Sequence, residues 1–470
     1  MNWTTDGVLT RRIIQVATVA VAAATIQGCG GDSPTAPSSA IAASRAGASL
    51  STRHALVEQV RALAAQRGIV PLPPAPYVRP ALARLGHDLA FDKVISGNRD
   101  IACMTCHLPE YATGDGRSLP IGAGGRGFGP ARTLARGAAI IPRNAPPLFN
   151  LYAMPALFLD GRVARDADGS YHTPAGAQLT PAMTRVLEFG AASAQGLFPP
   201  LSRAEMRGPV GDNDLTRLPD TADQAIWAAI MRRLGRIPRY RELFERAYPG
   251  TPFNRLNFAH ATNAIAGFLV SNMTFDRTPW DRFLAGDDNA LSTDQLRGAA
   301  SFLSLKCSIC HTGSTFSDNK FHDVALAQFG PGEGVLPNVH DDFGRYNVTG
   351  KPSDLYAFRT SPLRNIELTG PYGHAGEFKK LRDFIAHYSN SDVALRTYNP
   401  QQIDPLLFGT LIDNTDAVLA ARDTLLNGVV IPDSTIDRLT TYMTALTDPR
   451  ARDLRRLVPD RVPSGLPFDR

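Results

Sequence analysis

Cys103-Met104-Thr105-Cys106-His107 and Cys307-Ser308-Ile309-Cys310-His311 are two copies of one pattern, and they use four of the five cysteines of this 470-residue chain. The spacing fits covalent haem attachment, because two thiols can bond the two vinyl groups of one porphyrin while the adjoining imidazole reaches the iron. A CxxC pair can also form a redox dithiol or half of a zinc site, but neither needs a histidine directly after the second cysteine. The sequence therefore predicts two covalently bound c-type haems, with His107 and His311 as axial ligands.

Apolar residues at helical spacing occur between and ahead of the two motifs. Ile226, Ile230 and Leu234 lie on one face of a helix that can end at Gly235, and a similar stripe runs through residues 56–63. The 40 glycines and 36 prolines require many irregular connections. Because the two haem motifs are about 200 residues apart, two domains of similar size are favoured. We expect a mainly α fold with long irregular loops.

The N-terminus has the features of a bacterial export signal. Arg11-Arg12 precedes an apolar run, Ile13 to Ile26, which is shorter than the roughly 20 residues that a membrane-spanning helix needs. Ile26-Gln27-Gly28-Cys29 resembles a lipobox, which predicts a signal peptide over 1–28, a lipidated Cys29, and a periplasmic protein anchored to the membrane through that residue. An ordinary secretory signal with an unused thiol is the alternative. Residues 29–51 are rich in Ser, Ala, Gly and Pro, and predict a flexible linker.

The charge pattern excludes one class of partner. The net charge of +5 is small for this length, and no lysine-rich run or basic stretch interleaved with aromatic residues is present. We therefore expect no nucleic-acid partner.

Further motifs resemble those of the bacterial di-haem cytochrome c peroxidases and their MauG-type relatives. They are, in the family's order, Arg143-Asn144-Ala145-Pro146-Pro147, Phe158-Leu159-Asp160-Gly161-Arg162, Ser361-Pro362-Leu363-Arg364-Asn365 and Pro371-Tyr372-Gly373-His374. The resemblance covers about residues 89–449. It implies a mainly α fold of two cytochrome c-like domains with long irregular loops and one covalent haem each. We place a peroxidatic domain at 52–255 and an electron-transfer domain at 256–470.

The resemblance also implies a catalytic group. Glu205 matches the family's distal acid-base glutamate, and Gln195 and Pro199 fall at the family's spacing from it. Peroxide cleavage needs a group that moves a proton between the two oxygens, which a carboxyl side chain can do. An isolated glutamate is more often a solvated surface residue, and that interpretation stays open at this point.

Two departures from the peroxidase pattern favour the MauG type. The peroxidases carry a histidine after Ile-Gly that blocks the peroxidatic iron, whereas this chain has Ile121-Gly122-Ala123 and no histidine between His107 and His172. We infer that the N-terminal haem has an open face. Where the peroxidases supply a methionine to the C-terminal haem, this chain has Tyr388, whose phenolate would stabilise oxidised iron. Alternatively, Tyr388 merely packs, and His387 or another residue ligates the iron.

A third departure works against the MauG type. Leu159 occupies the position of a tryptophan that lies between the haems in both groups of relatives. Leucine cannot be oxidised, so either electrons tunnel without this relay, or another aromatic residue lies nearby, or the haems are weakly coupled. Phe158, Tyr152 and Trp227 are the candidates for a substitute.

The remaining sites are implied by the resemblance alone. Asn144, Thr369 and Pro371 match positions that offer oxygen ligands to a calcium ion between the domains. His374 is expected near the C-terminal haem, and Arg364 is expected to pair with a haem propionate.

The expected function is reduction of hydrogen peroxide in the periplasm at the N-terminal haem, with electrons relayed through the C-terminal haem from a small redox protein, a cytochrome c or a cupredoxin. A MauG-like oxidase that uses peroxide to modify side chains of a partner protein is one alternative. A di-haem electron carrier without catalysis is another, and two six-coordinate low-spin haems would favour it.

Overall fold

The structure is a computed structural model that describes residues 39–334 and 337–469. The chain divides between Ser51 and Thr52 into two units. The predicted signal peptide and Cys29 lie outside the described residues. No helix among the residues described is both long and apolar enough to cross a membrane.

The first described helix differs from the sequence prediction. Helix α1 (Ser39–Gln66) includes residues 39–51, which the sequence assigns to a flexible linker. This stretch is rich in alanine, the residue with the highest helix propensity, and that explains its helical structure.

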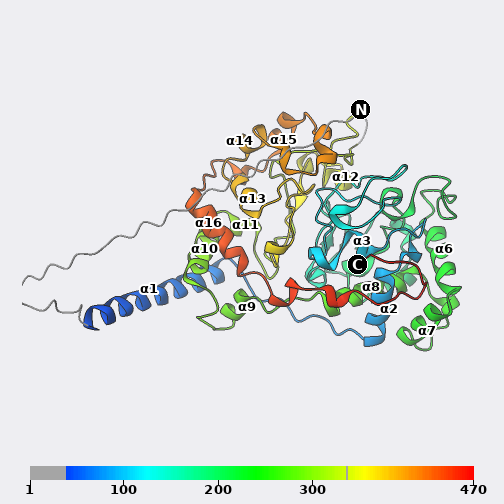
Figure 1. Cartoon of the computed structure of the whole chain (residues 1–470), viewed down its shortest axis with the longest axis horizontal. Coiled ribbons are helices and arrows are strands. Elements are labelled where there is room, and N and C mark those ends of the chain that lie inside the picture. The colour runs from blue at the N-terminus through cyan, green and yellow to red at the C-terminus, as the bar shows by residue number, and fades with distance from the viewer. Residues whose placement is uncertain (1–38, 335–336, 470) are drawn as a thin grey trace, which may run out of the picture. The chain divides into compact units, whose positions relative to one another are not determined.

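The remainder is mainly helical, with two small antiparallel sheets (Figure 1). The further helices are α2 (Pro80–Phe91), α3 (Cys103–Cys106), α4 (Pro181–Thr184), α5 (Ala191–Gln195), α6 (Asp223–Gly235), α7 (Pro238–Ala247), α8 (Phe258–Asn272), α9 (Pro279–Leu284), α10 (Thr293–Ser304), α11 (Cys307–Cys310), α12 (Tyr346–Thr349), α13 (Leu381–His387), α14 (Ser391–Arg396), α15 (Thr415–Ala421) and α16 (Asp433–Thr444). One sheet joins β1 (Ala156–Leu157), β2 (Val163–Arg165) and β3 (Tyr171–His172), and the other joins β4 (Phe321–His322) and β5 (Phe358–Arg359). The mainly α prediction is confirmed.

A first hydrophobic cluster forms where α2 packs against α8. Leu82, Leu85 and Leu89 recur at helical spacing on α2 and are fully buried. A Cβ atom at Gly86 would lie 1.7 Å from the backbone oxygen of Ala264, so only glycine allows the two helices to approach this closely. This packing fixes α2, the helix that precedes the first haem motif.

A second cluster repeats this arrangement around the second motif. Helix α10 packs against α16, and Leu296 and Phe302 of α10 are buried with Tyr442 of α16. A Cβ atom at Gly298 would lie 2.1 Å from the backbone oxygen of Arg438. Each motif is therefore preceded by a helix that a later helix holds through close contact at a glycine.

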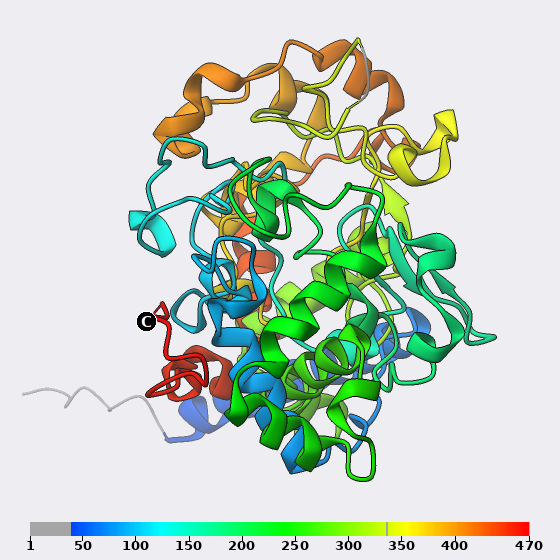
Figure 2. The same ribbon diagram turned by 90° about the vertical axis from the view of Figure 1, so that its right-hand side faces the viewer.

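The two clusters do not follow the chain in simple order. Helix α8, which the sequence places in the C-terminal domain, lies in the first cluster, and residues 57–69 lie in the second. Residues 451–462 return to the first cluster, and Figure 2 shows this C-terminal segment, in red, beside the blue α2. The predicted domain bounds, 52–255 and 256–470, stay a prediction. The helical stripe of Ile226, Ile230 and Leu234 is confirmed in α6, where all three are fully buried.

A candidate two-haem site

Both cysteine motifs line one cavity of about 580 Å³. Each pair of cysteines begins and ends a single helical turn, α3 or α11, which places the two thiols on one side with the histidine directly after them. All four cysteines are free of disulfides. Most of the lining is apolar, as a porphyrin requires.

The histidines of the two motifs are held in the same way. His107 Nδ1 lies 2.9 Å from the backbone oxygen of Thr113, and His311 Nδ1 lies 3.0 Å from that of Phe316. A carbonyl oxygen can only accept, so Nδ1 carries the proton and the lone pair of Nε2 is free for a metal. Burial also lowers the pKa of both rings, which keeps them neutral. Both residues thus fit the role of axial ligand to iron.

The thiols do not fit the alternative of a zinc or dithiol site. Burial raises the pKa of Cys103 and of Cys307 to about 11, and raises that of Cys106 as well. Redox and zinc-binding cysteines need the thiolate, which these surroundings disfavour. Neutral thiols in an apolar cavity fit thioether attachment to a porphyrin.

Glu205, Gln195 and Pro199 line the same cavity as His107. Glu205 lies in a π-helical turn, Arg203–Arg207, where its N–H donates to the Ser202 hydroxyl at 3.2 Å. Burial raises the pKa of Glu205 to about 7, a shift that Arg162 opposes and Glu333 reinforces. The structure therefore places this carboxyl inside the cavity, poised to gain or lose a proton near neutral pH.

The loop that replaces the blocking histidine is packed against this turn. The Ala123 N–H donates to the backbone oxygens of Ala204 and Glu205, at 3.1 and 2.9 Å. The buried guanidinium of Arg132 donates to the backbone oxygens of Ile121 and Gly122, both at 2.7 Å. The loop is fixed by these bonds, and it brings no imidazole to the cavity.

Four charged residues near Glu205 form a network of ion pairs that the sequence analysis did not predict. Arg143 donates to Asp342 at 2.7 Å and to Asp160 at 2.6 Å, and it pairs with Glu333 at 2.8 Å. Arg143 and Glu333 both line the cavity. Arg143 and Asp160 belong to motifs of the resemblance, but Glu333 and Asp342 lie in a glycine-rich loop that offers no sequence signal. The network therefore connects residues of the first half of the sequence with residues of the second half.

Tyr388 lines the cavity and His387 does not. His387 Nε2 lies 2.8 Å from the backbone oxygen of Val324. The cysteines of the second motif are among the groups that raise the pKa of the Tyr388 phenol, although burial is the main cause. Tyr388 is thus placed on the side of the second motif.

Two further haem contacts expected from the sequence, His374 and Arg364, both have partners within the chain. His374 lines the cavity, stacks on Phe358 with ring centroids 4.1 Å apart, and pairs with buried Glu377 at 2.7 Å. Arg364 also lines the cavity, but its two terminal nitrogens donate to Asp281 at 2.9 and 2.8 Å. Its Nε donates to the backbone oxygen of Ser314. Arg364 therefore has an anionic partner within the chain.

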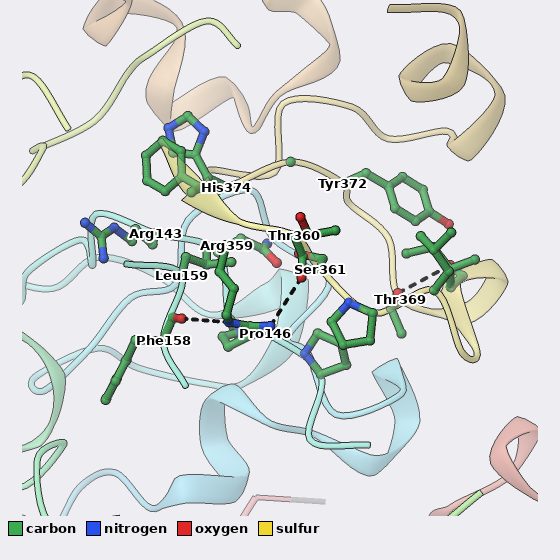
Figure 3. Close-up of a pocket in the computed structure, with 18 of the residues that line it drawn as sticks. Arg143, Pro146, Phe158, Leu159, Arg359, Thr360, Ser361, Thr369, Tyr372 and His374 are labelled. Atoms are coloured by element: carbon green, nitrogen blue, oxygen red, sulfur yellow. Dashed lines mark hydrogen bonds between the residues drawn. The ribbon is translucent and has the colours of Figure 1, made fainter. Parts of the chain in front are cut away.

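Leu159 lies in the cavity wall, as the resemblance implies (Figure 3). Among the candidate substitutes for tryptophan, Phe158 lines the cavity. Trp227 donates to the backbone oxygen of Leu197 within the first cluster, and Tyr152 donates to that of Pro73. Neither lines the cavity, so Phe158 is the aromatic residue of the three that shares this wall.

Asn144, Thr369 and Pro371 line a second, small cavity together with Asp115. The Asn144 amide nitrogen donates to the backbone oxygens of Arg117 and Ser118, which leaves its oxygen as the free group. Asp115 is buried, its Oδ2 has no partner, and burial raises its pKa to about 6. An orphaned carboxylate oxygen beside amide and carbonyl oxygens is a donor set that suits calcium.

His322 is a further charged residue of the large cavity. Its ring lies 2.6 Å from Asp423 and 3.1 Å from Asp318, and these carboxylates contribute to raising its pKa to about 11. Cys310 completes a group with metal-like spacing, but that sulfur belongs to the second haem motif. We interpret His322 as an ion-paired residue that ties the segment around Asp423 to the second motif.

Two Cys-X-X-Cys-His motifs with matching histidine geometry, opening into one apolar cavity, define a c-type cytochrome with two haem sites. Residues 80–289 match the di-haem cytochrome c peroxidase family. The cytochrome c551 peroxidase of Pseudomonas aeruginosa is 30% identical over 312 residues, which cover 66% of this chain and 72% of that protein. The chain belongs to the di-haem cytochrome c peroxidase family, which implies two c-type haems.

Other similar proteins include both MauG-type proteins and di-haem peroxidases. The methylamine utilization protein MauG of Methylophilus methylotrophus is 28% identical over 328 residues, covering 68% of this chain and 76% of that one. Among solved structures, a MauG-like protein associated with microbial copper homeostasis has a TM-score of 0.57 at 23% identity, covering 82% of this chain and 96% of that one. The di-haem peroxidase BthA of Burkholderia thailandensis has a TM-score of 0.54 at 21% identity, covering 86% and 100%. These two structures share the fold.

Proposed function

We propose that this protein reduces hydrogen peroxide at its N-terminal haem, with electrons relayed through its C-terminal haem. The observation that carries this proposal is the position of Glu205, a half-buried residue that lines the same cavity as His107. The bound haems supply the redox chemistry of peroxide reduction. A small redox protein, a cytochrome c or a cupredoxin, would supply the electrons.

The chain's own residues supply orientation and proton transfer. His107, whose Nδ1 donates to the backbone oxygen of Thr113, would hold the haem iron through Nε2. Glu205 takes a proton from one peroxide oxygen and returns it to the other, and a pKa of about 7 suits both steps. Gln195 and Pro199 shape the wall around the bound peroxide. The fixed loop at Ile121–Ala123 brings no imidazole to the cavity, so it would not compete with peroxide for the iron.

Glu205→Gln tests the proposal directly. Positioned proton transfer contributes about 10² to 10⁴ in rate, so peroxide reduction should slow on that scale while both haems stay attached. Glu242→Gln is the matched control, because Glu242 is exposed on α7 and pairs with Arg239. An unchanged rate in the Glu205 variant would remove Glu205 from the mechanism.

A second candidate function is oxidation of a partner protein's side chains, as in MauG-type relatives. Tyr388 in the cavity wall and the absence of histidine from the 121–125 loop favour it. Stoichiometric peroxide added to the oxidised protein, without reductant, separates the cases. An immediate and long-lived spectral change indicates the MauG type, and inertness until prior reduction indicates the peroxidase type. Permanent inertness indicates an electron carrier.

We also propose a calcium ion in the small cavity, held by Asn144, Thr369 and Pro371, with Asp115 as an additional oxygen donor. The unpartnered Oδ2 of Asp115 supports this assignment. Calcium content measured after exhaustive dialysis should fall in Asp115→Asn and Asn144→Ala variants. A wild-type protein without bound calcium contradicts the assignment.

The predicted location and domain layout complete the proposal. We propose one haem in each of two cytochrome c-like domains, supported by the repeated helix pairs α2–α8 and α10–α16. We propose export to the periplasm and anchoring through lipidated Cys29. Cys29→Ser should release the protein from membranes without changing its haem content, and a variant that still sediments with membranes contradicts the lipid anchor.

A further inference from the structure

Arg359 is a buried cation with no anionic partner among the residues that the structure describes. Its side chain lies in the wall of the large cavity, and the residue is 5% exposed. Within the described residues, no carboxylate oxygen lies within 4.0 Å of its guanidinium. Asp160 is the nearby acid that acts on it, but the Asp160 oxygens are bonded to Arg143 and Arg162.

The hydrogen bonds of Arg359 are too weak to compensate for this burial. Nε donates to the backbone oxygen of Phe158 and Nη1 to that of Thr360, both at 3.3 Å (Figure 3). Burial lowers the pKa of Arg359 to about 10, which shows that its charge is poorly solvated in the protein alone. Buried charges in native proteins are paired, because an isolated charge in the protein interior is strongly destabilising.

The other basic residues of the cavity wall are satisfied. Arg143, Arg162 and Arg364 each have a carboxylate partner. Lys306 is exposed and donates to two backbone oxygens. Arg132, which does not line the cavity, is also a buried guanidinium with no carboxylate partner among the described residues. It differs in making three hydrogen bonds of 2.7 Å to backbone oxygens. Arg359 differs from all of these, and it faces the cavity.

We propose that Arg359 binds a haem propionate and raises the reduction potential of that haem. This inference rests on the two haems that the family implies and not on the peroxide chemistry. Propionates are the anionic groups that the haems would bring into this mainly apolar cavity. The planar guanidinium suits a carboxylate, and β5 fixes its position through the Arg359 N–H, which donates to the backbone oxygen of Leu159 at 2.7 Å. Arg359 thus takes the role that the sequence assigned to Arg364.

Redox titration of Arg359→Gln, with the haem content measured alongside, tests this assignment. A positive charge beside a haem favours the reduced state, so its removal should lower the midpoint potential of at least one haem. We expect about a tenfold fall in the ratio of reduced to oxidised haem at a fixed potential, which is 59 mV for a one-electron couple. Arg233→Gln is the matched control, because Arg233 is a buried arginine, paired with Asp214, that does not line the cavity.

Arg359→Lys keeps the test decisive if the glutamine variant fails to bind haem. Lysine retains the positive charge, so haem content and potentials should stay close to wild type. It lacks the paired N–H donors of the guanidinium. The propionate bending modes in the resonance Raman spectrum should nevertheless shift. Unchanged potentials of both haems in a fully loaded Arg359→Gln protein overturn the proposal, as do unchanged propionate modes in Arg359→Lys. A shift caused by Arg364→Gln but not by Arg359→Gln also overturns it.

These measurements are independent of the proposed function. They need no peroxide, so a protein that is inert to peroxide can still show the shift in potential. An active peroxidase whose potentials ignore Arg359→Gln would refute only the propionate contact.

Discussion

The surroundings of the two cysteine motifs share one construction and differ in what faces the cavity. In each half, a helix leads into the cysteine motif, a later helix packs on it at a glycine, and a backbone oxygen orients the histidine. Around the first motif the wall then offers Glu205 and a loop without histidine, whereas around the second it offers Tyr388. The shared part suits haem attachment. The parts that differ support the proposal that peroxide reacts beside the first motif and that the second motif serves electron transfer.

Removing one pair of cysteines should have the largest effect, because it eliminates one of the two haem attachment sites. Cys103→Ala with Cys106→Ala should leave a protein with one covalent haem and no peroxide reduction. Cys307→Ala with Cys310→Ala should also retain one haem, but with the first site still able to bind peroxide. Haem staining of denatured protein and haem-to-protein ratios measure both outcomes. Two covalent haems in either variant would contradict the attachment assignment.

The two helix pairs can be compared through matched core truncations. Leu85 and Leu296 are fully buried in the first and second clusters. Each Leu→Ala change should reduce the free energy of unfolding by about 2 to 5 kcal/mol, because it leaves a cavity in packed surroundings. Denaturant unfolding of the two holoproteins measures the costs. If Leu85→Ala and an exposed control such as Leu406→Ala unfold alike, the first cluster is not a packed core.

Tyr388→Met sharpens the electronic difference between the halves. A phenolate favours oxidised iron and a thioether favours reduced iron, so the variant should raise the potential of the C-terminal haem. We expect about a tenfold change in its ratio of reduced to oxidised haem, or 59 mV. The potential of the N-terminal haem should hardly change. Tyr398→Phe, in a tyrosine that does not line the cavity, is the control.

Glu333→Gln should give the smallest effect, a change in pH dependence. The negative charge of Glu333 helps to raise the pKa of Glu205, so its removal should lower that pKa below about 7. With Glu205 as the base, the rate of reaction with peroxide rises as the pH increases through its pKa. The midpoint of this rise should therefore move to lower pH in Glu333→Gln by less than about one unit. A midpoint that moves to higher pH would show that Glu333 does not act on this group by charge.

The sequence was sufficient for features carried by local patterns. The two cysteine motifs, the stripe in α6 and the set of Glu205, Gln195 and Tyr388 in one cavity all follow from spacing or from the resemblance. The partners of charged residues could not be predicted, because they depend on side chains far apart in the chain. Arg364 bonds Asp281, 83 positions away, while Arg359, five positions before it, has no carboxylate partner in the described part of the chain. We did not predict that α1 begins at Ser39, because the Ser, Gly and Pro content of residues 29–51 indicated a linker although the stretch is also rich in alanine.

The C-terminal segment that packs beside α2 has a consequence for biogenesis. Asp92, at the end of α2, accepts hydrogen bonds from Ser464, and Lys93 pairs with Asp469. Residues 372 positions apart in the sequence therefore meet at the end of the helix that leads into the first cysteine motif. We expect the surroundings of this motif to stay open until the two segments have come together. The thiols would then be accessible to the machinery that ligates the porphyrin while the chain is still folding.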